Sequence, residues 1–265
     1  MYQFVYHKPT TVAEAATLLA NNADARVLAG GQSLIAAMKL RLSQPSDLVD
    51  ISGIADLRGI EVDATAVTIG AMTRHAEVAH SADVKKAIPA LALLAHGIGD
   101  RMVRNMGTIG GSIAHDDPAA DYPAAVLGLV ATINTTKRKI AGDGFFKGMY
   151  ETALEPGEII ASVSFPIPKR AAYVKFQNPA SRYALVGVFV ADTARGPRVA
   201  VTGAAGSVFR ATAMEDALKA RFDPASVANI TVPAEGLNSD LHASAEYRAH
   251  LITVMAKRAV AAAIG

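Results

Sequence analysis

Cysteine is absent from the 265-residue sequence, and so is tryptophan. A chain without cysteine cannot form a disulfide, use a thiolate nucleophile or hold an iron–sulfur cluster through thiolate ligands. Any iron–sulfur chemistry connected with this protein must therefore take place in another chain.

A charge excess and a long apolar run are also missing. The 26 Lys and Arg residues nearly balance 24 Asp and Glu residues, and no basic run is interleaved with aromatic residues, so nucleic-acid binding is disfavoured. No segment approaches the roughly 20 apolar residues of a membrane-spanning helix, and no targeting leader follows Met1. We expect a cytoplasmic protein without a transmembrane segment, whose apolar content of 51% supports a substantial core.

Two common phosphate-binding motifs do not occur. These are the G-x-G-x-x-G of dinucleotide-binding folds and the G-x-x-x-x-G-K-S/T of P-loop proteins. The seven histidines are scattered without the spacing of metal ligands, which predicts that the chain has no metal site.

Two glycine pairs are the most informative feature that the sequence does contain. Ala29–Ser33 reads AGGQS, and Gly107–Ala114 reads GTIGGSIA. Adjacent glycines let a backbone approach a ligand closely and turn its N–H groups toward one anion. One glycine pair is usually a plain turn, but two predict a pair of phosphate-binding loops, such as a diphosphate requires. A side chain on Gly110 or Gly111 would then fill the space of the diphosphate.

Apolar periodicity and start signals predict a mixed helix and strand content. A capping box at Thr11–Glu14 opens a helix, Asp63–Thr65 forms the turn of a hairpin, and Pro123 lies in the first turn of a helix whose N-cap is at or near Asp121. The patterns predict strands at residues 2–6, 26–29, 48–51, 58–62, 66–70, 131–134, 159–165, 172–176, 184–191 and 199–204, and helices at residues 11–22, 33–42, 74–80, 89–96, 124–129, 211–221 and 245–263.

Changes of pattern divide the chain into three units. The first unit, residues 1–56, alternates strands and helices, and a hairpin opens the second unit, residues 57–168. Two prolines and two charges at Pro166–Arg170 interrupt the regular pattern, so we place the start of the third unit, residues 169–265, there.

Three segments resemble the FAD-binding medium subunit of aerobic carbon monoxide dehydrogenase and its molybdenum hydroxylase relatives, a family that includes xanthine dehydrogenase. The segments are Ala29–Ser33, Val103–Ser112 and Asp117–Ala124, and the resemblance extends over nearly the whole chain. It implies an α+β fold in which a FAD-binding domain of the vanillyl-alcohol-oxidase type is split into two α/β subdomains. A C-terminal α+β domain of the carbon monoxide dehydrogenase flavoprotein type would follow.

The resemblance also implies that FAD is the cofactor and indicates which residues contact it. Two segments would hold the diphosphate, one residue the adenosine half, and the others the adenine or ribose pocket and the flavin side. These residues are Val27, Leu28, Ala29, Gly30, Gly31, Gln32, Ser33 and Leu34, then Thr108, Ile109, Gly110, Gly111, Ser112 and Ala114, and finally Asp121 (adenosine), Ile160 (adenine or ribose pocket), Lys175 (cofactor contact) and Tyr183 (near the flavin ring). No catalytic residue and no metal ligand is implied.

Several roles stay open at this point. Asp121 could accept hydrogen bonds from a ribose or cap a helix, and helix capping is the expected use of Asp116 and Asp117. Tyr183 could equally be an aromatic residue packed at a strand end. Gln32 stands where the carbon monoxide enzymes usually have histidine, which argues against carbon monoxide as the substrate.

In the family that the sequence resembles, the medium subunit works with two partners. A large subunit carries the molybdenum cofactor, and a small iron–sulfur (2Fe–2S) subunit passes electrons to FAD, which delivers them to an external acceptor. The assembly is usually a dimer of heterotrimers. Two alternatives remain open: a self-contained FAD-dependent oxidoreductase with its own substrate pocket, and a non-catalytic protein that keeps the fold without the cofactor.

Overall fold

In the computed structural model, which describes residues 1–265, the N-terminal unit is a small parallel sheet with two helices. It comprises β1 (Val5–His7), α1 (Val12–Asn21), β2 (Arg26–Leu28), α2 (Leu34–Lys39) and β3 (Asp47–Asp50). The strand order is β1-β3-β2, and both pairings are parallel. Two 3-10 turns, Ile51–Gly53 and Ala55–Leu57, lead out of the unit.

The central unit is an antiparallel sheet covered by helices. Its strands run in the order β4 (Ile60–Val62), β5 (Ala66–Gly70), β10 (Ile160–Pro166), β6 (Thr132–Thr135) and β7 (Lys139–Ala141). The helices are α3 (His75–His80), α4 (Ala82–Ala87), α5 (Pro89–His96), α6 (Arg101–Met106), α7 (Ile109–His115) and α8 (Tyr122–Gly128). A 3-10 turn at Gly142–Gly144 and a separate pair, β8 (Phe146–Gly148) and β9 (Glu151–Thr152), lie between β7 and β10.

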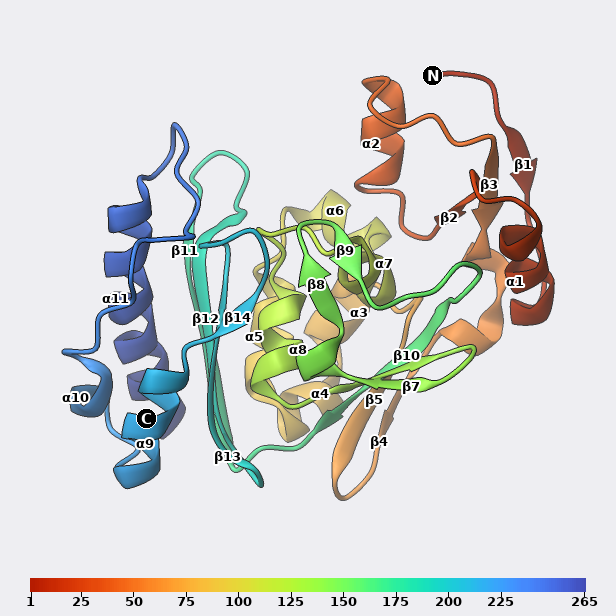
Figure 1. Ribbon diagram of the computed structural model, residues 1–265. Coiled ribbons are helices and arrows are strands. Elements are labelled where there is room, and N and C mark those ends of the chain that lie inside the picture. Colours follow the sequence, from red (N-terminus) through yellow and green to blue (C-terminus); the bar gives the residue numbers. More distant parts are fainter.

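The C-terminal unit is a four-stranded antiparallel sheet with helices on both faces (Figure 1). The order is β11 (Arg170–Gln177), β12 (Ala184–Thr193), β13 (Gly196–Thr202) and β14 (Phe209–Arg210). Helices α9 (Thr212–Ala220), α10 (Pro224–Val227) and α11 (Ala245–Ile264) complete the unit. α9 and α11 contact this sheet, and so do α5 and α8 of the central unit.

Strand β12 shows why this sheet is covered on both faces. Alternate side chains of a strand point to opposite faces, and Val186, Val188 and Val190 join the core beneath α9 and α11. Phe189 and Ala191 point the other way, into the core of the central unit. The central core therefore extends across residue 168, and the three-unit division remains a prediction about organisation.

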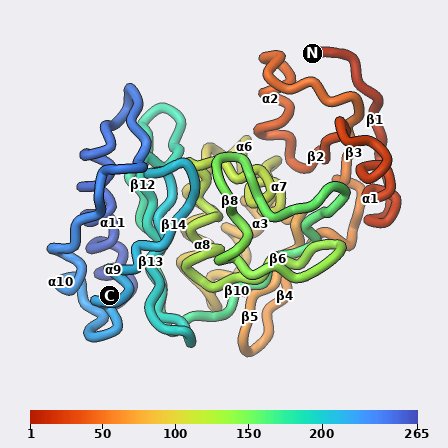
Figure 2. The backbone as a smooth tube through the Cα atoms, viewed as in Figure 1, coloured from red at the N-terminus to blue at the C-terminus, as the bar shows by residue number.

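The chain path carries the N-terminus and the C-terminus to opposite ends of the molecule (Figure 2). The core of the N-terminal unit, which includes Ala15 and Val49, is completed by Met72 and Ile159 from the central unit. None of the helices combines the length and the apolar character that crossing a membrane requires.

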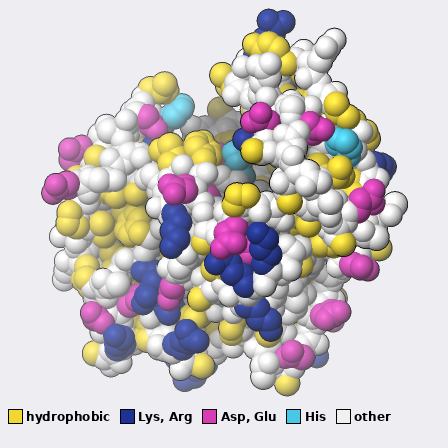
Figure 3. All heavy atoms as spheres, turned by 45° about the vertical axis from the view of Figure 1, so that its right-hand side comes forward, with side chains coloured by type: hydrophobic (Ala, Val, Ile, Leu, Met, Phe, Trp, Pro, Cys, Tyr) yellow, Lys and Arg dark blue, Asp and Glu magenta, His cyan; other side chains and the backbone are white.

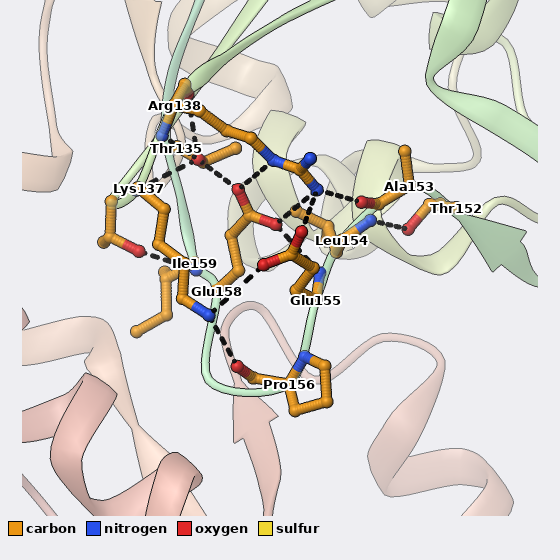
Figure 4. Close-up of polar contacts among 11 residues, drawn as sticks. Thr135, Lys137, Arg138, Thr152, Ala153, Leu154, Glu155, Pro156, Glu158 and Ile159 are labelled. Atoms are coloured by element: carbon orange, nitrogen blue, oxygen red, sulfur yellow. Dashed lines mark hydrogen bonds and ion pairs between the residues drawn. The ribbon is translucent and has the colours of Figure 1, made fainter.

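A buried glutamate fixes the segment that bears Ile159. The Glu158 side chain is fully buried and accepts hydrogen bonds from Thr135 Oγ1 at 2.6 Å, Arg138 Nε at 3.1 Å and the Glu155 N–H at 2.8 Å. Figure 4 shows these groups converging on the glutamate carboxylate from the β6–β7 turn and from residues 152–159. A Cβ on the nearby Gly157 would lie 3.3 Å from Cβ of Ala20, so this segment packs closely against α1.

Local signals predicted many of these elements. The Thr11 hydroxyl accepts a hydrogen bond from the Glu14 N–H at 3.2 Å, as the capping box requires, and the Asp63 carboxylate organises the β4–β5 turn. Pro123 is in the first turn of α8 with Asp121 at the N-cap position. However, the Asp121 side chain makes no capping hydrogen bond, so the alternative that this carboxylate caps the helix is wrong.

The second glycine pair is not in a loop. Residues Ile109–His115 form α7, which Thr108 caps by accepting a hydrogen bond from the Gly111 N–H. The helix predicted at residues 33–42 is shorter than expected, because α2 covers only Leu34–Lys39. The prediction also missed α4, α6, β7, β8, β9, β14 and α10.

Candidate functional site

A cavity of about 450 Å³ lies where the N-terminal unit meets the rest of the molecule. Figure 3 shows the surface hollowed beside the projecting N-terminal part. The wall of the cavity comes from residues 29–34, from α6 and α7, and from the β11–β12 connection at residues 181–183. Cavities of this size are typical small-molecule sites.

Most of the predicted site residues line this cavity. They are Val27, Ala29, Gly30, Gly31, Gln32, Ser33, Leu34, Thr108, Gly111, Ser112, Ala114, Asp121 and Tyr183. The structure thus brings together residues that are up to 156 positions apart in the sequence, as the span from Val27 to Tyr183 shows. Five predicted residues are not part of the wall: Leu28, Ile109, Gly110, Ile160 and Lys175.

The first glycine motif presents unused backbone donors. None of the N–H groups of residues 30–34 donates a hydrogen bond within the chain. Gly31 has φ +69°, so the chain turns sharply just before α2 begins, and successive N–H groups in a turn can form a concave site that binds anions. We call residues 30–34 the cradle loop.

Three N–H groups of the second glycine motif, those of Ile109, Gly110 and Gly111, are engaged within the chain. Ile109 N–H donates to Thr73 O at 3.1 Å, Gly110 N–H to Ala71 O at 2.8 Å, and Gly111 N–H to Thr108 Oγ1 at 3.2 Å. A Cβ on Gly110 would lie 2.5 Å from Cβ of Ala71, in a packed interface. The expectation that a Gly110 side chain would enter the ligand space is therefore wrong, whereas Thr108, Gly111 and Ser112 do line the cavity.

The second glycine motif, Gly107–Ala114, instead positions the first, Ala29–Ser33. A Cβ on Gly30 would lie 2.3 Å from the Met106 carbonyl oxygen, and one on Gly107 would lie 2.6 Å from His75 Nε2. One on Gly111 would lie 3.5 Å from Cβ of Ala29. The absence of side chains at these glycines allows the cradle loop to pack directly against the start of α7.

His75 is a cavity residue that the sequence interpretation missed. It is 5% exposed, and burial, together with the Arg104 guanidinium, lowers its pKa to about 4, so the imidazole is neutral at pH 7. Arg104 donates to the carbonyl oxygens of Ile98 and Gly99 at 2.9 Å, which orders a segment of the cavity wall. A histidine at the first position of the short helix α3 carries no local signal that could have indicated this position.

Asp121 sits at one end of the cavity in a buried polar cluster. Its Oδ1 accepts a hydrogen bond from Tyr173 Oη at 2.5 Å and lies 3.1 Å from Lys175 Nζ. Burial raises the pKa of Asp121, and the Lys175 ammonium and the Tyr173 hydroxyl oppose that rise. Lys175 Nζ also donates to Gly97 O at 2.9 Å and Arg182 O at 3.0 Å, so all three of its donors are used inside the chain.

The remaining predicted residues differ in their surroundings. Tyr183 is 50% exposed at the cavity mouth rather than packed in a core, and Ile160 is 4% exposed within the central core. Asp117 Oδ1 accepts the Ala119 N–H at 2.8 Å. Asp116, the C-terminal residue after α7, has both carboxylate oxygens buried without a partner, so it caps no helix N-terminus.

The donor set at the cavity suits a diphosphate-linked cofactor. The row of free N–H groups in the cradle loop supplies hydrogen bonds without requiring a cluster of positive side chains, and Arg26 and Arg182 add two cations to the wall. Apolar wall residues such as Ile98, Val103 and Leu34 offer surface for ring systems. The residues present therefore fit FAD.

Comparison with known proteins gives one matching family model and close relatives over the full length. The family described as "FAD binding domain in molybdopterin dehydrogenase" matches residues 2–168. The carbon monoxide dehydrogenase medium chain of Hydrogenophaga pseudoflava is 37% identical, with 98% of this chain and 97% of that protein covered. The nicotine 6-hydroxylase medium subunit of Paenarthrobacter nicotinovorans is 34% identical, with 96% and 95% covered.

A solved structure shares the whole fold. Quinoline 2-oxidoreductase from Pseudomonas putida 86 contains a chain that superposes with a TM-score of 0.90 at 31% identity, covering 99% of this chain and 97% of that one. The α+β FAD-binding fold that the sequence resemblance implied is therefore confirmed.

Proposed function

This chain belongs to the family of FAD-binding domains of molybdopterin dehydrogenases, and from that premise we propose that it is the electron-transferring flavoprotein subunit of a molybdenum-containing hydroxylase. FAD is its cofactor, and its chemistry is oxidoreduction. It receives electrons from a small iron–sulfur (2Fe–2S) subunit and passes them to an external acceptor. A large subunit holds the molybdenum cofactor and the substrate, and the assembly is a dimer of heterotrimers.

The observation that carries this proposal is the cradle loop. Five consecutive residues have free N–H groups at a cavity whose wall also carries Asp121 and Tyr183. Free backbone donors in such number are costly in a folded protein unless water or a ligand pairs with them. A bound diphosphate pairs with them directly.

Each part of the wall has a distinct role in this account. The N–H groups of the cradle loop bind the diphosphate, and Asp121, oriented by Tyr173 and Lys175, accepts a hydrogen bond from the adenosine half. Lys175 acts through Asp121, because its donors are already engaged. Ile160 supports the adenine or ribose pocket from the core beneath it, and Tyr183 contacts the flavin side. When bound, FAD supplies two-electron chemistry that also exchanges single electrons with iron–sulfur centres.

A self-contained oxidoreductase is the second candidate for this chain. It would need titratable side chains in the cavity to activate an organic substrate. Among the acidic side chains of the cavity, Asp121 is paired with Tyr173 and Lys175, and Asp117 accepts the Ala119 N–H. These engaged side chains favour the subunit function, in which the cavity is filled by the cofactor.

The test is expression of the chain alone and together with the chains encoded beside its gene. We expect the isolated chain to bind FAD, and we expect the coexpressed chain to copurify with a cysteine-rich small subunit and a molybdenum-binding large subunit. An interface of such a permanent complex buries more than about 2,000 Å² in total, so the complex should survive gel filtration. A chain that stays monomeric in the presence of both partners would contradict the proposal.

A further inference from the structure

The His75 side chain in the cavity wall has no hydrogen-bond partner within the chain. The residue is 5% exposed, and its Nδ1 is sealed from solvent without a hydrogen bond. A buried polar group without a partner destabilises the folded state, whereas a phenylalanine ring would fill much the same space without that cost. The imidazole at this position therefore indicates a partner outside the chain.

The contacts of the ring place Nε2 on the cavity side. Nδ1 is the sealed nitrogen, and Nε2 is not sealed. Gly107 also belongs to the cavity wall, and a Cβ on Gly107 would lie 2.6 Å from His75 Nε2. The His75 N–H donates to Gly107 O at 3.0 Å, and the Tyr122 ring packs against the imidazole with the ring centroids 5.4 Å apart. These contacts hold the imidazole with its open nitrogen beside Gly107.

The surroundings also make Nε2 a hydrogen-bond donor. Burial and the Arg104 guanidinium lower the pKa of His75 to about 4, so the imidazole is neutral at pH 7 and carries one N–H. A proton on Nδ1 would have no acceptor, because that atom is sealed without a partner. The hydrogen bonds of the two nitrogens decide which of them is protonated, so Nε2 keeps the proton and can donate it to a ligand in the cavity.

This donor lies next to the cradle loop. Gly107 separates the two, since a Cβ on Gly30 would lie 2.7 Å from Cα of Gly107. The free N–H groups of the cradle loop and Nε2–H of His75 are all donors, so the group that pairs with them must be rich in acceptors. The oxygens of a diphosphate only accept hydrogen bonds, whereas each ribityl or ribose hydroxyl must also donate one.

We propose that His75 binds the FAD diphosphate through Nε2–H, beside the cradle loop. This inference rests on the proposed function, because it names a further binding residue for the cofactor of that function. His75 is the first residue of α3 and lies outside both glycine motifs. Because α3 packs against α6 (Figure 1), the histidine ties the position of the cofactor to the helices of the central unit.

The test measures binding of FAD and of ADP to the full chain freed of cofactor, by calorimetry. ADP carries a diphosphate but no flavin. His75→Phe keeps a ring against Tyr122 and has no donor, whereas His75→Gln keeps an N–H donor near the position of Nε2. His96→Phe is the matched control, because His96 is exposed and is not part of the cavity wall.

We expect the wild type and His96→Phe to bind each ligand equally. His75→Phe should weaken the binding of both FAD and ADP at least about tenfold, as the loss of a hydrogen bond to a charged group implies, and His75→Gln should restore most of that loss. Equal ADP binding by the wild type and His75→Phe would overturn the diphosphate contact. A loss in His75→Gln as large as in His75→Phe would also overturn it, because the ring and not the donor would then matter. A wild-type chain that binds no FAD would instead contradict the proposed function.

Discussion

Gly30 is the residue on which the position of the cradle loop depends most directly. A Cβ at this position would lie 2.3 Å from the Met106 carbonyl oxygen and 2.7 Å from Cα of Gly107. Both atoms belong to the backbone, so neither can rotate away, and the cradle loop itself must shift.

We therefore predict that Gly30→Ala weakens FAD binding at least tenfold, about 1.4 kcal/mol, because the displaced N–H groups no longer converge on the diphosphate. The measurement is the dissociation constant from the fluorescence of released FAD. Gly144→Ala is the control, since nothing lies within 4 Å of a Cβ there. An unchanged dissociation constant in Gly30→Ala would show that the cradle loop does not bind the diphosphate of FAD.

Asp116 makes the stability of the protein depend on pH. It is 1% exposed with both oxygens unpaired, and burial together with the Asp117 carboxylate raises its pKa from 3.8 to about 7. Between pH 4 and pH 7 the Asp116 carboxyl holds a proton in the native state that it has released in the unfolded state. The free energy of unfolding therefore falls as the pH rises from about 4 to 7.

Replacing the Asp116 carboxyl should remove this pH-dependent fall in the free energy of unfolding. We predict that Asp116→Asn raises the free energy of unfolding at pH 8 by on the order of 2 kcal/mol, and much less at pH 4. Asparagine also tolerates the left-handed backbone of this residue, φ 48°. Urea unfolding of both proteins at the two pH values is the measurement. A gain that is equal at pH 4 and pH 8 would show that the carboxyl does not titrate as described.

At the scale of elements, the predictable parts were those with local causes. The capping box of α1 and the Asp63 turn form hydrogen bonds between residues no more than four positions apart, and such contacts leave a sequence signal. Helix α7 depends on contacts with residues far away in the sequence, because the N–H groups of Ile109 and Gly110 donate to the carbonyl oxygens of Thr73 and Ala71. Two adjacent glycines predict a loop by propensity, and these tertiary contacts override that propensity.

The candidate site shows the same division. The glycine motif, hydroxyl residues and Asp121 could be assigned to the cavity from the sequence, because the resemblance rests on those residues. His75, Ile98 and Gly99 could not, because their place in the wall depends on how α3 and α6 pack against one another.

The Glu158 cluster predicts how the N-terminal unit is held. Glu158 is fully buried and accepts hydrogen bonds from Thr135, Arg138 and Glu155 (Figure 4). Glu158→Gln removes the charge that compensates Arg138, so we predict a loss of stability of about 1–3 kcal/mol. Because residues 155–159 pack against α1, amide exchange should accelerate in α1 and stay unchanged in α11.

Hydrogen exchange read by mass spectrometry measures this effect. Asp216→Asn serves as the control, because Asp216 is 69% exposed in a surface pair with Lys219, and such pairs contribute little to stability. Equal acceleration in α1 and α11 would mean that Glu158 supports the whole fold rather than the contact with the N-terminal unit.

At the scale of the whole molecule, the core and the cavity tie the three units together. The central core includes Phe189 and Ala200 of the C-terminal sheet, and the cavity is bounded by all three units. A cofactor in that cavity would contact each of them.

We therefore predict that FAD raises the midpoint of thermal unfolding of the whole chain in a single transition, which calorimetry with and without added FAD can test. Two transitions, only one of them sensitive to FAD, would contradict this coupling.

We propose that electrons reach FAD in this chain from a partner subunit rather than from a substrate bound to the chain itself. The most direct measurement is the rate of flavin bleaching when candidate hydroxylation substrates are mixed, without oxygen, with the FAD-loaded chain alone and with the assembly that contains the iron–sulfur and molybdenum subunits. We expect rapid bleaching in the assembly and none in the isolated chain, although dithionite still reduces the flavin of the isolated chain. Rapid bleaching of the isolated chain by an organic substrate would contradict this proposal and establish a self-contained flavoenzyme.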